Sequence, residues 1–204
     1  MDRSLEGIFV LRRLVVLCAA VTTLSACSGG TTTSAAGEPG AAPSSAAAPA
    51  QVLKLGEPAT IRGEGGQPLT VTPTGVYFYR GRTGDALRPA ERWWAAVSIR
   101  VEATKAADRL PPGATGEWQV RQGSRTFTTV GGNAGNAPWV GRVGEGVEQV
   151  APGDPQVAVK TFDIPKGGGE LRWVTQGEPP VRWSMPGRTT GSGLDDVKAV
   201  MRVG

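Results

Sequence analysis

The stretch RWWAAVSIRVEAT, residues 92–104, decides the fold of this chain. Every second residue from Trp93 onward is apolar, and together these residues form one set: Trp93, Ala95, Val97, Ile99, Val101 and Ala103. A period of two is that of a β-strand, whose successive side chains point to opposite faces of a sheet. The other face begins with Trp94 and becomes polar at Ser98, Arg100 and Glu102. We therefore predict a strand here, in the middle of a sheet.

Shorter strand patterns lie on both sides of this stretch, separated by Gly and Pro, and no window of residues 51–186 has a convincing helical period. About seven to nine strands in a domain of this length predict an immunoglobulin-like antiparallel β-sandwich, and the fold class is therefore all-β. The flanking strands are expected at Gln51–Leu55, Leu69–Thr72, Val76–Arg80, Glu117–Arg121, Arg125–Val130, Val157–Ile164, Leu171–Thr175 and Val181–Met185. Residues 187–204 form a tail, in which Leu194, Val197, Val200 and Met201 have helical spacing. The tail is either a short amphipathic helix or frayed.

The N-terminus has the pattern of an export signal. Residues 1–13 end in Arg12 and Arg13, and residues 14–26 carry no charge. A charged segment followed by an apolar run of this length is typical of a secretory signal peptide, and the run is too short to span a bilayer. An ordinary signal peptidase prefers small residues in an A-x-A-like arrangement, and Leu24 occupies the first of those positions.

Residues Leu24, Ser25, Ala26 and Cys27 instead resemble the lipobox of bacterial lipoproteins. In that family the cysteine thiol receives a diacylglyceryl group, and cleavage leaves the modified cysteine as the first residue. Two acyl chains anchor a protein stably, whereas one gives only marginal binding. The resemblance implies lipidation at Cys27, a signal peptide over residues 1–26 and attachment to the extracytoplasmic face of the cell membrane.

Residues 27–50 are rich in Ala, Ser, Pro and Gly, with one charged residue and no large apolar side chain. Such a segment cannot repay the entropy of ordering, so we expect a disordered tether that spans roughly 25–30 Å as a flexible coil.

Composition excludes several kinds of site. The chain has no histidine and two cysteines, Cys18 and Cys27. If Cys18 leaves with the signal peptide and Cys27 is lipidated, no thiol remains for a disulfide, a metal site or a nucleophile. The net charge is +4, and Lys and Arg are scattered along the sequence, which gives no support to nucleic-acid binding. Asp154 and Asp163 are weak candidates for calcium contacts. We expect no enzyme activity, catalytic residue, metal or cofactor.

Several segments together resemble a known family. They are Lys54-Leu55-Gly56-Glu57, the strand at 92–104, Ala151-Pro152-Gly153-Asp154 and Thr161-Phe162-Asp163-Ile164-Pro165. Their order over residues 52–185 resembles a domain of unknown function in Gram-positive surface lipoproteins, related to secreted immunoprotective antigens with a telokin-like, immunoglobulin-like sandwich. Members often close the central strand with Asn, where this chain has Ala103-Thr104-Lys105. The resemblance implies the sandwich fold but no catalytic residues.

Tryptophans provide the candidate binding residues. Trp93 and Trp94 are neighbours on one strand, so their rings point to opposite faces, and Trp139 follows Pro138 in a loop. Exposed Trp is favoured at binding hot spots. One hypothesis is that Trp94 with Arg100, or Trp139, marks a partner surface; the alternative is that loops and neighbouring strands cover these rings. We expect a lipid-anchored binding module whose partner is an envelope protein, a cell-wall glycan or a small apolar ligand, or else a structural or antigen-like surface protein.

Overall fold

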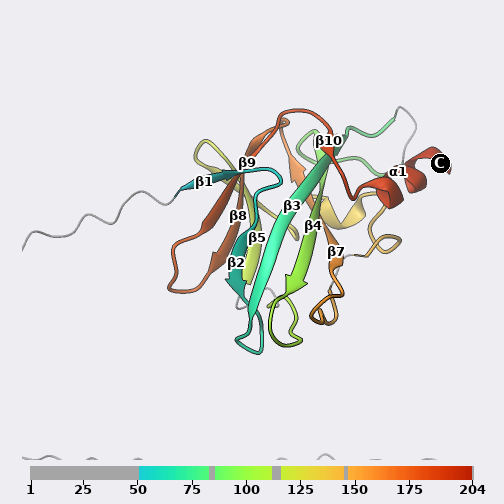
Figure 1. The fold of residues 1–204 in the computed structure, drawn as a ribbon. Coiled ribbons are helices and arrows are strands. Elements are labelled where there is room, and N and C mark those ends of the chain that lie inside the picture. The colour runs from blue at the N-terminus through green and yellow to red at the C-terminus, as the bar shows by residue number, and fades with distance from the viewer. Residues whose placement is uncertain (1–50, 83–85, 112–115, 145–146, 204) are drawn as a thin grey trace, which may run out of the picture. The chain divides into compact units, whose positions relative to one another are not determined.

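The computed structural model describes residues 51–82, 86–111, 116–144 and 147–203. The signal peptide, Cys27 and the tether lie outside this part of the chain. The described residues form two sheets of five strands and one short α-helix, which is consistent with a β-sandwich (Figure 1).

The first sheet has the strand order β1-β9-β8-β5-β6. Its strands are β1 (Val52–Lys54), β5 (Gly116–Gln122), β6 (Arg125–Thr128), β8 (Gly169–Thr175) and β9 (Val181–Met185). All neighbours are antiparallel except β1 and β9, which run parallel. Strands β5 and β6 pair as a hairpin, and Gly123 in its turn has a φ of 61°, which glycine adopts without strain.

The second sheet has the order β10-β3-β4-β7, and β2 pairs with another part of β3. Its strands are β2 (Ala59–Arg62), β3 (Pro68–Tyr79), β4 (Trp93–Ala103), β7 (Gln156–Ile164) and β10 (Thr190–Gly191). Strand β4 lies between β3 and β7, so the predicted central strand is confirmed. A 3₁₀ turn, η1 (Ala134–Asn136), and the helix α1 (Asp195–Val203) complete the chain.

Strand β3 corrects one expectation, because the sequence predicts two strands that break at Pro73. The structure has a single strand with a register shift between Pro73 and Gly75. Strand β2 pairs with β3 before Pro73 and β10 pairs with it after Pro73, so the missing amide proton of proline falls between two partners. A bulge therefore accommodates the residue that was expected to end the strand.

The main core lies between the two sheets. Ala95, Val97, Ile99 and Val101 of β4 are fully buried there, which confirms the alternation. The first sheet contributes three tryptophans, with the ring centroids of Trp118 and Trp173 5.1 Å apart and those of Trp118 and Trp183 5.7 Å apart.

A second, smaller cluster covers the outer face of the second sheet. It joins Trp94 and Ala96 of β4 to Trp139 and to Leu194 and Val197 at the start of α1. The helical alternative for the tail is therefore confirmed. The C-terminal segment therefore covers the outward-facing apolar residues of β4, Trp94 and Ala96.

Candidate functional site

A basic groove crosses the outer face of the first sheet. The inward positions of β5, β8 and β9 carry core residues, so the residues between them point outward. Pairing places Arg121 opposite Glu170, and Arg172 opposite Arg182. The groove has a volume of about 500 Å³ and its charged lining residues are Arg121, Lys166, Glu170, Arg172 and Arg182.

Electrostatics make this groove positive. Glu170 is its single carboxylate and forms ion pairs with Arg172 at 2.5 Å and with Arg182 at 3.7 Å. The side chains of Glu170, Arg172 and Arg182 are about a fifth exposed, so they form the floor of the groove. The Glu170 carboxylate offsets the repulsion between the two guanidinium groups. Arg121 and Lys166 are exposed at its edge. Four cationic side chains against one carboxylate leave a local excess of positive charge.

One end of the groove is fixed by a glutamine. The Nε2 atom of Gln122 donates hydrogen bonds to the carbonyl oxygens of Lys166 at 2.7 Å and Gly168 at 2.6 Å. Gly169 has a φ of 119°, and a Cβ there would lie 2.7 Å from the Arg121 carbonyl oxygen. The loop between β7 and β8 therefore requires glycine and holds the Lys166 backbone beside β5.

The chemistry of this groove suits anion binding. Guanidinium groups present several N–H donors in a planar fork that matches carboxylate and phosphate oxygens. No serine, threonine, cysteine or histidine is among the residues that line it. Within the described ranges, no three His, Cys, Asp or Glu side chains are grouped so as to hold a metal ion.

The tryptophans proposed as binding residues are buried, and the hypothesis that they are exposed is wrong. Trp94 has no exposed surface and Trp139 is 1% exposed. The indole nitrogen of Trp94 donates to the Asn133 carbonyl oxygen at 2.8 Å, and that of Trp139 donates to the Thr161 hydroxyl at 2.9 Å. Both rings therefore belong to the second cluster, as the alternative expectation held, and neither is available to a partner in this structure.

Arg100 does not join these rings in one surface. It lies on the same face of β4 as Trp94, but six residues of strand separate them by roughly 20 Å. Its guanidinium is exposed and pairs with the Glu102 carboxylate at 2.8 Å.

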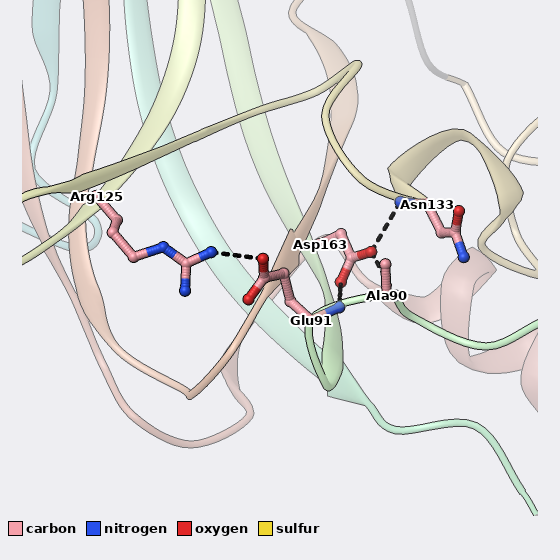
Figure 2. A network of polar contacts seen from close by, with 5 residues as sticks. All are labelled: Ala90, Glu91, Arg125, Asn133 and Asp163. Atoms are coloured by element: carbon pink, nitrogen blue, oxygen red, sulfur yellow. Dashed lines mark hydrogen bonds and ion pairs between the residues drawn. The ribbon is translucent and has the colours of Figure 1, made fainter.

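Asp163 accepts hydrogen bonds from three backbone amides and is 2% exposed. Figure 2 shows its Oδ1 atom beside the Glu91 amide, and its Oδ2 atom beside those of Ala90 and Asn133. Glu91 in turn pairs with Arg125 at 2.5 Å. The three amides belong to two different loops, so Asp163 anchors both loops to β7. Asp154 is exposed in the turn before β7.

Asp108 fixes another turn in the same way. Its carboxylate accepts amide hydrogen bonds from Gly65, Gln67 and Arg109 at 2.8–2.9 Å. Burial raises the pKa of the Asp108 carboxyl, but these hydrogen bonds lower it more, and the pKa lies below its usual value.

Comparison with known proteins adds no assignment: no family model matches the chain, and neither the curated proteins nor the solved structures contain a match. In the described part of the chain, no helix has the length and apolar character needed to cross a membrane.

Proposed function

We propose that this protein is a lipid-anchored binding module on the extracytoplasmic face of the cell membrane, and that it binds an anionic cell-wall glycan. The observation that carries the proposal is the basic groove on the first sheet. Cations that are scattered in the sequence gather there on one face, beside a loop whose shape depends on glycine.

The N-terminal pattern supports the location. The lipobox-like residues end at Cys27, and residues 28–51 separate that cysteine from β1. A tether, as expected from the composition of this segment, would let the folded domain reach envelope polymers beyond the lipid headgroups. Replacing Cys27 by Ser is expected to release the protein from the membrane fraction, and intact-mass analysis of the unchanged protein should show the acyl chains.

We infer further that the two-sheet fold is immunoglobulin-like. Support comes from its largely antiparallel pairing and from a chain that crosses repeatedly between two sheets around one core. Three consecutive strands, β2, β3 and β4, pair within one sheet, whereas in the constant-type immunoglobulin domain no more than two consecutive strands share a sheet.

A binding assay with a matched control tests the groove. The probe is polygalacturonate, an anionic glycan, with neutral dextran as the uncharged comparison. Replacing Arg121 and Lys166 by Gln removes two exposed cations and leaves the Glu170 ion pairs in place. We expect about tenfold weaker binding, since exposed charge contacts contribute roughly 0.5–1 kcal/mol each.

The control replaces Arg100 and Lys105 by Gln and changes the net charge by the same amount. Arg100 is in β4 of the second sheet, and Lys105 follows the end of that strand. This control should bind nearly as well as the unchanged protein. Equal weakening of both double variants would mean that net charge alone attracts the polymer. Absence of any binding to either glycan would favour the alternative of a structural or antigen-like surface protein without a ligand site.

A further inference from the structure

The helix α1 packs unevenly on the outer face of the second sheet. Leu194 just before it and Val197 in its first turn are 1% and 0% exposed. Val200 and Met201, on the same apolar face, are only partly buried. The first half of the helix therefore closes on the sheet, and the second half leaves its apolar side chains incompletely covered.

A pocket of about 290 Å³ lies beside this second half. Most of its lining is apolar, and side chains from three separate segments form it: Tyr79, Ala86, Leu87, Pro138, Val200 and Met201. Leu87 is 53% exposed, so part of this apolar lining is open to water. Apolar surface of this kind gains free energy when an apolar ligand removes it from water.

Two arginines lie at the rim of the pocket. Arg82 and Arg142 are the ionisable residues other than Tyr79 that line it, and both are exposed at its rim. Among the described residues that line the pocket, none is an aspartate or a glutamate. An arginine beside an apolar pocket can pair with a carboxylate while the pocket takes the apolar remainder of the ligand.

We propose that this pocket binds a monomeric, single-chain anionic amphiphile, with its acyl chain against Val200 and Met201 and its carboxylate at Arg142. The site is separate from the basic groove, because it lies on the other sheet and its lining is mainly apolar. It therefore does not depend on the function proposed above.

Calorimetric titration of the full chain carrying Cys27→Ser tests this site, since that substitution removes an acyl chain that would compete. The probe is decanoate below its micelle concentration. Saturable one-to-one binding is expected, and octanoate should bind about 15-fold more weakly, because each methylene contributes about fourfold. Decyltrimethylammonium, which has the same chain and the opposite charge, should bind at least tenfold more weakly than decanoate.

Two variants separate the acyl contact from the charge contact. Val200→Trp fills the pocket and should abolish binding, whereas Val130→Trp, at a site that is 86% exposed, should leave it unchanged. Arg142→Gln is at the exposed rim and should not disturb folding. It should weaken decanoate binding about fivefold and leave the binding of uncharged decanol unchanged.

The proposal would be overturned by equal affinity for decanoate and decyltrimethylammonium, by equal decanoate binding of Val200→Trp and the unchanged chain, or by no saturable binding of the monomeric probe. Binding only to anionic lipid vesicles would also overturn it, since the occupant would then be a bilayer surface. The Arg121 and Lys166 variant of the groove should bind decanoate normally, so a failure at one site is distinguishable from a failure at the other.

Discussion

Substituting Asp163 by Asn tests whether a single buried carboxylate holds the loops at this end of the domain. The carboxylate accepts from Glu91 through Oδ1 and from Ala90 and Asn133 through Oδ2, at distances of 2.7–2.9 Å. Asparagine has the same shape, but only one of its two terminal atoms can accept. The best arrangement keeps the oxygen at the Oδ2 position and turns the amide NH₂ group toward the Glu91 amide.

The magnitude follows from this geometry. The part-buried N–H group of Glu91 loses its acceptor, which costs about 1–3 kcal/mol, and the two remaining hydrogen bonds lose the contribution of charge, about 1 kcal/mol each. We therefore expect the free energy of unfolding to fall by about 3–5 kcal/mol. For a domain of this size that corresponds to a decrease in Tm of roughly 6–20 °C.

Urea unfolding followed by tryptophan fluorescence measures this loss. The matched control is Asp154→Asn, the same chemical change at an exposed carboxylate, which should alter stability by less than about 0.5 kcal/mol. If Asp163→Asn also remains within about 1 kcal/mol of the unchanged protein, the reasoning is refuted, because the three amides would then be satisfied in another way.

Two further predictions concern the other anchors of the fold. Because the pKa of Asp108 is lower in the folded state than in the unfolded chain, its ionised form stabilises the fold above about pH 4, and this contribution disappears as the pH falls through the folded pKa. Asp108→Asn should therefore lower stability at pH 7 and flatten its decline on acidification, as measured by urea titrations at a series of pH values. Leu194→Ala should lower the free energy of unfolding by about 2–4 kcal/mol or locally detach α1, with hydrogen exchange of residues 195–203 as the readout and the partly exposed Lys198→Ala as the control.

Local periodicity predicted the central strand correctly. The residues of β4 alternate over eleven positions, and no turn residue interrupts them. The same argument failed at β3, since Pro73 breaks the pattern locally while the bulge that accommodates it depends on β2 and β10. Strand β2 has four residues and was missed, because so short a pattern does not stand out without its partner.

Coverage of the tryptophans could not be predicted in the same way. Trp94 is covered by Asn133, Trp139 and Leu194. These residues come from segments that lie 39 or more residues away in the chain. A strand pattern shows which face a ring is on, but it does not show what covers that face. The spacing of the apolar residues in the tail left a short helix and a frayed end as alternatives, and it did not show that a helix would cover β4 in particular.

The basic groove illustrates the same limit for charge. Arg121, Arg172 and Arg182 each alternate with core residues of a strand, which indicates only that they point outward. Strand order and register bring them together, and both are properties of pairing between distant segments.

The outer face of the first sheet is cationic, whereas that of the second sheet carries an apolar cluster and pocket. The two proposed ligands should therefore respond differently to salt. Binding in the groove depends on exposed cations and must weaken as salt screens them. Binding in the pocket beside α1 depends mainly on removing apolar surface from water, which salt does not screen. A salt series with polygalacturonate and decanoate on one preparation should thus separate the two sites without any substitution, and parallel salt dependence would argue that both ligands use the same charged surface.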